Sequence, residues 1–346
     1  PEDDFIKSIT VRGRADILLT PQEDSRAVSF HNFGEKLEEP LIVEVKTVAS
    51  ALDLLPEDGE IMHWYQARMY TYLYYKTRDT SPPENVTYAL AYVSAETLEA
   101  KYYKKEEAFR DLEKWFDQSL QDYLKLARSI RFWWDKRNRS IDALSFPYPN
   151  LRAGQRSFIE HAYKAIEEIT PFLAQAPTGI GKTMSALYPA IKQLRHGHFD
   201  HIFYLTAKRS TRLVAENALE DLRNHSHLAL KQITLRAKEQ MCLRPDLYCD
   251  TALCPYATQY YDNLPRALNA LGPLEIFHPE NLLKAGEQYK LCPFELSLDL
   301  AVYCDLIIGD YNHAFDPRIQ LERFFGQGSG SQILLVDEAH NLVDRA

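Results

Sequence analysis

The sequence predicts an α/β protein, and three stretches with different patterns support that fold class. Residues 1–95 mix short β-rich runs with one helical stretch. Residues 96–145 are heavily charged and mostly helical in pattern. Residues 146–346 alternate short apolar runs with helical segments, as expected of a parallel sheet that is buried on both faces. A chain of 346 residues can form two or three such domains, each with its own core.

Each stretch predicts particular elements. In the first we expect one helix at about 61–75. The strands expected there are 9–11, 16–19, 41–47 and 86–93. The charged stretch predicts helix from residue 96 to about 137, and the two prolines of 145–150 predict a linker. The strands expected after the linker are 172–176, 201–206, 233–235, 306–309 and 333–336. Residues 238–300, with four cysteines and little strand pattern, are expected to form an insertion.

Charge limits the possible partners. The net charge of -9 at pH 7 argues against binding a polyanion over the whole surface, although a local basic groove would suffice. Residues 125–139 contain six Lys or Arg and a single Asp, interleaved with Phe132, Trp133 and Trp134. Two interpretations stay open for this segment: a surface that contacts DNA, or the end of a helix with a few core aromatics.

The sequence shows no membrane segment. No apolar run approaches the roughly 20 residues of a membrane span, and the chain does not open with a signal-peptide pattern. We therefore expect a cytoplasmic protein without a membrane partner. Because cytoplasmic thiols stay reduced, its five cysteines are expected to be metal ligands or core residues and not disulfides.

Residues 176–183, Ala-Pro-Thr-Gly-Ile-Gly-Lys-Thr, have the pattern of a phosphate-binding loop. They follow an apolar run and open a helical segment, which is the context that such a loop needs. Gly179 and Gly181 let backbone N–H groups approach the phosphates of ATP closely. Lys182 would hold the β- and γ-phosphates, and the Thr183 hydroxyl would bind Mg²⁺. Ala176 stands where the generic pattern has its first Gly.

A second motif, Ile-Leu-Leu-Val-Asp-Glu-Ala-His at 333–340, complements this loop. Its apolar run delivers Asp337 and Glu338 at the carboxyl end of a strand, where ligands bind in α/β sheets. Asp337 would hold the Mg²⁺ through water, and Glu338 would polarise the attacking water. An Asp-Glu pair alone is usually a solvated strand end, but together the two motifs resemble those of superfamily 2 helicases and translocases. Arg152 and Gln155 resemble the adenine-reading segment of that superfamily, or are surface residues of a helix.

Four cysteines predict a metal centre within the insertion. Cys242, Cys249, Cys254 and Cys292 stand in the pattern C-x6-C-x4-C-x37-C, and the absence of a C-x-x-C pair argues against a structural zinc site. An iron–sulfur cluster is larger than one ion and accepts wider spacings. The alternatives are zinc or four scattered core thiols. Cys304 lies in an apolar run and is expected to be a core residue.

The order of these motifs resembles the XPD and DinG type of helicases, over about residues 150–346. Residues 305–317, after the last cluster cysteine, are also similar to that family. The resemblance implies a RecA-like motor domain, a [4Fe–4S] cluster, ATP-driven 5′→3′ movement on single-stranded DNA, and strand separation. Thr206, Lys208 and Lys238 resemble positions of the family beside the DNA backbone. The alternative for these three is ordinary loop polarity.

The front stretch contains residues typical of a metal-dependent nuclease site. Asp16 closes the run Gly-Arg-Ala-Asp, and Glu44 and Lys46 lie on one face of a predicted strand because side chains alternate along it. Two carboxylates beside a Lys can hold Mg²⁺ or Mn²⁺ and orient water for phosphodiester hydrolysis. Gln66 and Tyr70 share one helix face at i, i+4.

Together these residues resemble the RecB-like branch of the PD-(D/E)xK nucleases, which implies a restriction-endonuclease-like α/β domain at about 1–95. That branch usually has another acidic residue or His on an earlier helix. We expect that residue to lie before the start of this chain, which leaves cleavage by residues 1–346 in question.

The sequence therefore predicts three parts: the nuclease-like domain (1–95), a helical connector (96–145) and the helicase domain (146–346). The expected function is an ATP-dependent DNA helicase or translocase with a linked nuclease, in DNA repair or processing. Its expected partners are single-stranded DNA or DNA junctions. The alternative is a translocase whose front domain is inactive and only grips DNA. The second motor domain, with its arginine finger, is expected outside these residues, so we expect no appreciable ATP-driven unwinding by them alone.

Overall fold

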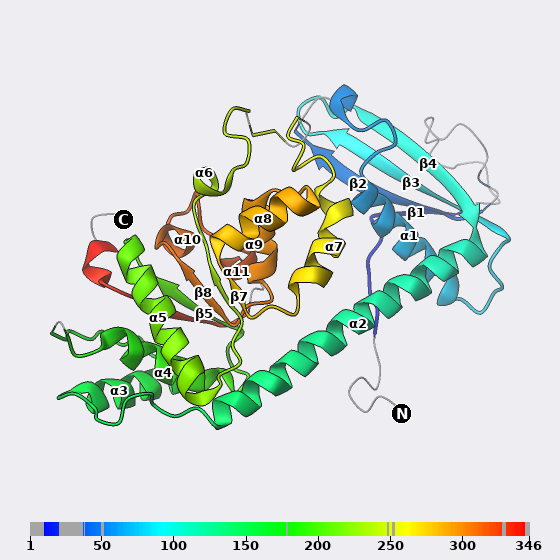
Figure 1. Cartoon of the computed structure of the whole chain (residues 1–346). Helices are drawn as coiled ribbons and strands as arrows, with labels where there is room; N and C mark the ends of the chain where they lie inside the picture. Colours follow the sequence, from blue (N-terminus) through cyan, green and yellow to red (C-terminus); the bar gives the residue numbers. More distant parts are fainter. Residues whose placement is uncertain are drawn as a thin grey trace. The chain divides into compact units, whose positions relative to one another are not determined.

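A computed structural model gives the structure of the chain. It describes residues 10–20, 37, 39–49, 52–177, 179–247, 249–250, 253–326 and 330–342. The chain forms two compact units, Pro1–Ser129 and Ile130–Ala346 (Figure 1). The boundary falls inside one long helix, α2 (Phe109–Asp142), and not at either end of the expected connector. No helix in the part of the chain that is described is long and apolar enough to cross a membrane.

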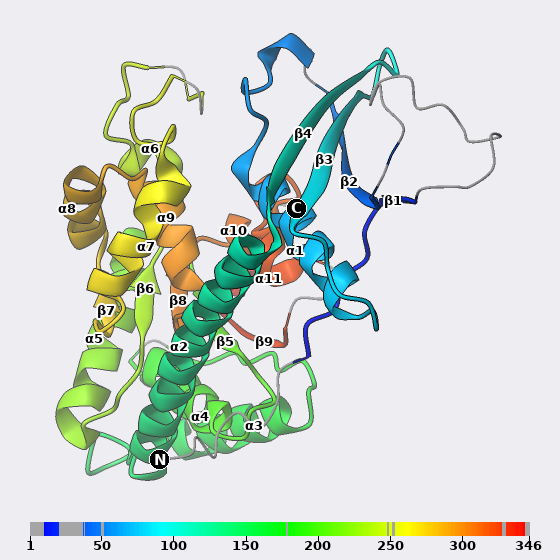
Figure 2. The same ribbon diagram turned by 90° about the vertical axis from the view of Figure 1, so that its right-hand side faces the viewer.

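The first unit is built on a four-stranded mixed sheet. Its strands are β1 (Ile17–Leu19), β2 (Leu41–Val48), β3 (Asn85–Ser94) and β4 (Ala100–Ala108). They lie in the order β1-β2-β3-β4 (Figure 2), and only the β2–β3 pair is parallel. After a short 3-10 turn, η1 (Leu52–Leu54), helix α1 (Ile61–Lys76) makes the crossover that parallel neighbours require.

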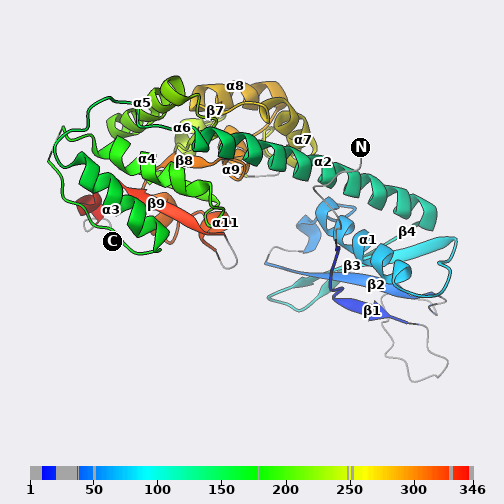
Figure 3. The same cartoon turned by 90° about the horizontal axis from the view of Figure 1, so that it is seen from below.

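Helix α1 covers one face of this sheet (Figure 3). Trp64 and Ala67 of α1 are buried against Tyr88, Leu90 and Tyr92 of β3. The register pairs β2 and β3 in parallel, with Glu44 opposite Leu90 and Lys46 opposite Tyr92. Glu44 and Lys46 therefore lie on the same face of the sheet as α1.

Two expectations for this region need correction. Residues 100–108, expected to be helical, form strand β4, because their charged and tyrosine side chains suit an edge strand paired with β3 on one side only. Helix begins at Phe109, as α2. The strand expected at 9–11 begins outside the described residues, and Thr10 and Val11 are not in a strand. The strands and helix expected at 16–19, 41–47, 61–75 and 86–93 are present.

The second unit contains a five-stranded parallel sheet. Its strands are β5 (His201–Leu205), β6 (Gln232–Thr234), β7 (Ile276–Phe277), β8 (Leu306–Gly309) and β9 (Gln332–Val336). They lie in the order β7-β6-β8-β5-β9. The predicted strands at 201–206, 233–235, 306–309 and 333–336 are thus confirmed.

Helices cover both faces of this sheet, as the apolar strands predict (Figure 1). The helices of one face are α3 (Gln155–Glu167), α4 (Lys182–Leu194) and α5 (Arg209–Ser226). Those of the other face are α6 (Lys238–Met241), α7 (Tyr260–Leu271), α8 (Pro279–Tyr289), α9 (Pro293–Ala301), α10 (Asn312–Phe315) and α11 (Glu322–Phe325). A 3-10 turn, η2 (Ala339–Leu342), follows β9. The expected insertion (238–300) is therefore mostly helical, contributes the short strand β7 to the sheet and packs onto it.

The strand expected at 172–176 is not formed. Leu173 is 91% exposed in this stretch, and β5 is the only strand in the described part of the chain that pairs with β9. An apolar run forms a strand only where a neighbour accepts its backbone hydrogen bonds, and here the outer edge of β9 faces a cavity instead.

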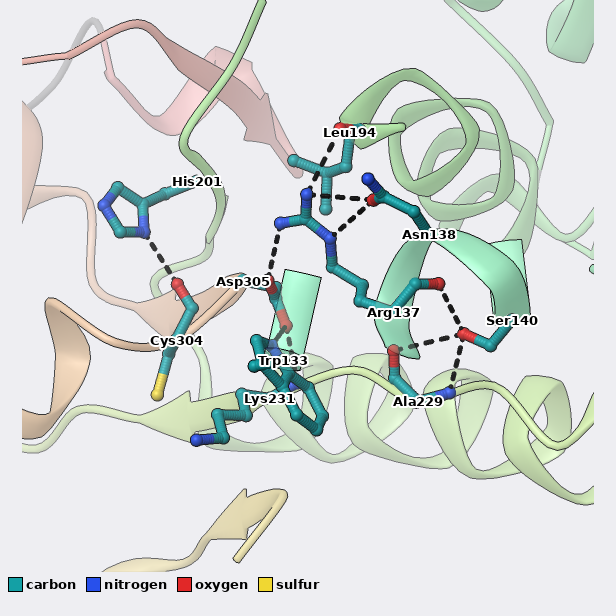
Figure 4. Close-up of polar contacts among 10 residues, drawn as sticks. All are labelled: Trp133, Arg137, Asn138, Ser140, Leu194, His201, Ala229, Lys231, Cys304 and Asp305. Atoms are coloured by element: carbon teal, nitrogen blue, oxygen red, sulfur yellow. Dashed lines mark hydrogen bonds and ion pairs between the residues drawn. The ribbon is translucent and has the colours of Figure 1, made fainter. Parts of the chain in front are cut away.

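A buried polar cluster fixes the end of α2 to the second unit (Figure 4). The Asp305 carboxylate, just before β8, accepts hydrogen bonds from Arg137 (2.8 Å), from the Trp133 indole (3.0 Å) and from the Lys231 backbone N–H (2.8 Å). Arg137 and Asp305 are only 5% and 3% exposed. For Trp133 and Arg137, the interpretation of a helix end with core side chains is therefore the better one.

Candidate functional site

The two nucleotide motifs converge on one cavity. It has a volume of about 1200 Å³, and its lining includes Lys182, Thr183, Asp337 and Glu338. Lys182 and Thr183 open helix α4, and Asp337 and Glu338 directly follow strand β9. The residues that the sequence assigned to phosphate, Mg²⁺ and water thus share a single space.

The phosphate loop has the backbone that its glycines predict. Gly179 and Gly181 have φ angles of +87° and +84°, a region that side chains other than glycine rarely adopt. A Cβ at Gly181 would also lie 2.8 Å from the side-chain nitrogen of Gln155. Gly181 precedes the first residue of α4, so the N-terminus of a 13-residue helix opens at the loop. That position favours an anion such as phosphate.

Lys182 lies between the two motifs. Its Nζ donates a hydrogen bond to the Ala176 carbonyl (3.3 Å) and lies 3.8 Å from Oε1 of Glu338. A phosphate in the loop would compete with Glu338 for this ammonium group. The carboxylate would then be available to a water molecule.

Arg152 and Gln155 contact the loop from the side of α3. The Arg152 guanidinium donates to the Gly179 carbonyl, and the Arg152 N–H donates to the Gln155 side chain (3.0 Å). Gln155 is only 2% exposed, so it is not a surface residue of a helix. Both residues support the loop here, and adenine contact remains a prediction.

The turn after β9 is held from two sides. The Asp337 N–H donates to the Leu205 carbonyl (3.0 Å), and the Tyr311 hydroxyl donates to the carbonyls of Asp337 and Glu338. Glu338 has a φ of +52°, a left-handed conformation that costs a non-glycine residue roughly 1–3 kcal/mol. The surrounding contacts therefore have to maintain this turn.

Two tyrosines of this site were not found from the sequence. Tyr204 of β5 lines the cavity, and its hydroxyl lies 3.4 Å from that of Thr183. Burial and then the charge of Asp337 raise the pKa of Tyr204, so its phenol stays protonated. Tyr311 follows β8. Tyr204 lies within one apolar run and Tyr311 just after another, so the sequence around them carries no motif. Their role follows only from the contacts that they make in the folded protein.

The oxygen donors for Mg²⁺ are partly assembled. Thr183 and Asp337 line the same cavity. Among the described residues, no three His, Cys, Asp or Glu side chains are grouped as a metal site. Mg²⁺ at nucleotide sites usually takes only one or two protein ligands and completes its shell with phosphate and water. The pair of donors fits that pattern.

The four predicted cluster cysteines are not gathered around one point in the described structure. Cys242 ends α6, and Cys292 precedes α9. The Cys292 N–H donates to the Tyr256 carbonyl (2.9 Å), which ties its segment to the one that carries Cys254. Cys249 is exposed. The expected core residue Cys304 is indeed buried.

The other predicted DNA contacts lie at loops of the second unit. Thr206 is only 1% exposed, and its hydroxyl is bonded to that of Thr211. Lys208 is the residue before α5, and its carbonyl accepts from Thr211 (2.8 Å). Lys238 opens α6, and its pKa is raised chiefly by a hydrogen bond to Cys249.

In the first unit, the three nuclease-motif residues come together. The Asp16 carboxylate accepts from the Val45 N–H (2.9 Å), and Lys46 pairs with Oε1 of Glu44 at 2.7 Å. Glu44 is only 3% exposed, and its second oxygen, Oε2, is buried with no hydrogen-bond partner among the described residues. Burying such an acceptor unpaired is costly, so this atom is suited to a ligand.

Helix α1 adds to this arrangement. A Cβ at Gly13 would overlap the ring of Tyr70, so the backbone before Asp16 lies directly on α1. Gln66 is exposed. The sequence did not indicate His63, whose Nδ1 lies 2.8 Å from the Tyr92 hydroxyl. Burial, and then the charge of Lys46, lower the pKa of His63. Its place one helical turn before Gln66 is a signal that could have revealed it.

Comparisons with known proteins bear on the second unit. The family model DEAD_2 matches residues 183–346. The chain is 21% identical over 252 residues to a protein described as a regulator of telomere elongation helicase 1 homolog from Anopheles gambiae, covering 58% of this chain and 25% of that one. It is 25% identical over 241 residues to the general transcription and DNA repair factor IIH helicase subunit XPD/RAD3 of Saccharomyces cerevisiae, covering 57% and 29%.

A solved structure described as an XPD helicase is 20% identical, with a TM-score of 0.38, over 56% of this chain and 34% of that one. The chain spans about a quarter of the length of the curated relatives that it matches. By these matches the chain is similar in sequence to helicases, among them the XPD/RAD3 subunit.

Proposed function

We propose that this chain is the nucleotide-binding part of an ATP-dependent DNA helicase or translocase that acts in DNA repair or processing. The observation that carries the proposal is the pairing of Lys182 with Glu338 across a cavity that Thr183 and Asp337 also line. The names of the curated relatives supply the class of substrate, DNA.

The chemistry follows from the positions of these residues. Loop amides, the start of α4 and Lys182 bind the phosphates. Thr183 and Asp337 would hold Mg²⁺, which neutralises charge on the phosphate oxygens. Lys182 turns from Glu338 to the γ-phosphate, and Glu338 then orients the attacking water. Neither residue forms a covalent bond with the nucleotide.

The DNA-binding role is assigned to the loops at the carboxyl ends of β5 and β6. Lys208 and Lys238 are the candidate contacts with the phosphate backbone of single-stranded DNA or of a junction, and the buried Thr206 supports the first of these loops. Movement in the 5′→3′ direction and a second motor domain elsewhere in the full-length protein follow from the family resemblance.

Measuring ATP binding tests the nucleotide site on which the proposal depends. In the full-length protein, Lys182→Ala should weaken binding of ATP about tenfold or more, because it removes the charge that faces the phosphates. Lys164→Ala is the matched control, since Lys164 is an exposed residue of α3 paired with Glu168. Equal ATP affinity in wild type and Lys182→Ala would overturn the proposed site.

We also propose that the first unit is a metal-dependent DNA nuclease. Its support is the Glu44–Lys46 pair, whose Glu44 Oε2 has no hydrogen-bond partner among the described residues, and the hydrogen bond of Asp16 to the backbone N–H of Val45 between them. Asp16 and Glu44 would hold Mg²⁺ or Mn²⁺, which activates water for attack on a phosphodiester. Lys46 would orient that water or stabilise the developing charge.

A nuclease assay with Mg²⁺ or Mn²⁺ separates cleavage from mere binding of DNA. The full-length wild-type protein should cleave single-stranded DNA, and Lys46→Ala should lower the cleavage rate at least about 100-fold while retaining its DNA affinity. Lys104→Ala, on the edge strand β4, is the control. Equal cleavage by wild type and Lys46→Ala contradicts the nuclease, and unchanged DNA binding without cleavage favours the alternative of an inactive grip.

The four cysteines are proposed as ligands of an iron–sulfur cluster. The wide spacing, and the hydrogen bond that joins the Cys292 segment to the Cys254 segment, support this assignment. Because their sulfurs are not gathered in the structure, no step of the mechanism above depends on a cluster. Protein purified anaerobically should be brown and contain iron and sulfide. Colourless protein with bound zinc would replace the cluster by a zinc site.

A further inference from the structure

Tyr311 connects strands that are not neighbours. The sheet order places β5 between β8 and β9. Tyr311 follows β8, yet its hydroxyl donates to the carbonyls of Asp337 and Glu338, which follow β9. The side chain thus reaches over the end of β5, and it is only 1% exposed. A buried phenol in this position fixes the distance between the two strand ends.

The residue that Tyr311 holds has an unusual backbone. Glu338 has a φ of +52°, and its carboxylate lies 3.8 Å from Lys182. The direction of the Glu338 side chain depends on this left-handed turn. The Glu338 carbonyl also accepts from the backbone and side chain of Asn341. Removing the Tyr311 hydroxyl would therefore loosen the turn without unfolding it.

The residue before Tyr311 connects to a different site. Asp310 lies 3.2 Å from the Arg212 guanidinium, and the Arg212 side chain is only 12% exposed. Arg212 is in the first turn of α5, directly after the loop that carries Thr206 and Lys208. The Thr206 N–H also donates to the Gly309 carbonyl (3.0 Å). The proposed DNA loop and the Asp310-Tyr311 segment are therefore tied together twice.

We propose that Tyr311 is a positioning residue for Glu338, and that the Arg212–Asp310 ion pair makes this positioning respond to DNA at the 206–208 loop. The proposal rests on the proposed ATP hydrolysis. A phosphate bound at the loop shifts the start of α5, and Arg212 carries the shift to Asp310. Tyr311, the next residue, then changes the turn that aims Glu338 at water. Such coupling between two sites is a difference in free energy, and it is reciprocal.

The first test separates positioning from binding. In the full-length protein, Tyr311→Phe should lower kcat for ATP hydrolysis about tenfold and leave KM for ATP within about twofold, because Tyr311 acts through Glu338 and not on the nucleotide. Tyr303→Phe is the control: Tyr303 is a half-buried tyrosine of the same unit, and the described residues show no hydrogen bond from its hydroxyl. An unchanged kcat would overturn the role of Tyr311. A lower kcat that is fully explained by a smaller fraction of folded protein would overturn it as well.

The second test addresses the link to DNA. Arg212→Gln should reduce the stimulation of ATP hydrolysis by saturating single-stranded DNA about fivefold or more, with the rate in the absence of DNA unchanged. Arg212→Lys, which keeps the charge, should restore most of the stimulation. A variant that binds DNA more weakly but reaches the same maximal stimulation contradicts the link. If the wild-type protein hydrolyses no ATP, the proposed function itself is wrong, which is a separate result.

Discussion

At the scale of single residues, the sequence identified the side chains whose chemistry is local. Lys182, Thr183, Asp337 and Glu338 were all predicted, and all four line one cavity. Their motifs are short because the phosphate loop and the strand end each act within a few residues. Tyr311 was not predicted, since its partner lies 26 residues away and the contact depends on strand order.

A partly buried histidine makes stability depend on pH. His201 opens β5, its Nδ1 lies 2.7 Å from the Cys304 carbonyl, and burial lowers its pKa (Figure 4). Because the folded pKa is below the unfolded value of about 6.5, the unfolded chain binds more protons below that pH. The folded state should therefore lose stability as pH falls from about 7 to 5.

Urea denaturation of wild type and His201→Asn over this pH range measures the effect. The Asn variant should lose less stability between about pH 7 and pH 5, because it has no imidazole to protonate. Identical pH dependence in the two proteins would show that His201 does not contribute. Burial also lowers the pKa of His313 in the same unit. The pH dependence of the free energy of unfolding of a His313→Asn variant can therefore be compared with that of His201→Asn.

At the scale of elements, apolar runs predicted strands, and each run formed a strand only where a neighbouring strand paired with it. The apolar runs of β5, β8 and β9 form strands because each has a partner. The similar run at 172–176 has none among the described strands, forms no regular secondary structure and is exposed over 172–175. The charged residues of β4 predict helix, because such residues occur both in exposed helices and in edge strands. Pairing with β3 decides for the strand.

The attachment of α2 to the second unit gives a prediction for stability. Arg137→Ala removes one partner of a buried ion pair and leaves the Asp305 charge without it. The free energy of unfolding should fall by about 3–5 kcal/mol. Arg131→Ala on the same helix is the control, because its pair with Asp135 is exposed and should contribute less than about 1 kcal/mol. Equal losses in the two variants would show that the buried cluster does not anchor α2.

At the scale of the whole molecule, the sequence predicted two α/β parts, and the structure has two units with separate cores. Their boundary could not be predicted, because α2 is a continuous helix and only the packing of its last turns assigns them to the second unit. The family match covers residues 183–346 alone. The function proposed for the first unit therefore rests on the geometry of that unit, above all on the Glu44–Lys46 pair.

We propose that Glu338 activates water in an ATP site that responds to DNA. The most direct test of this claim is ATP turnover by the full-length protein with and without single-stranded DNA, comparing wild type with Glu338→Gln. Wild type should show DNA-stimulated turnover, and Glu338→Gln should still bind ATP but turn it over at least about 100-fold more slowly. Turnover by Glu338→Gln at the wild-type rate, or wild-type protein without any DNA-stimulated turnover, would contradict the claim.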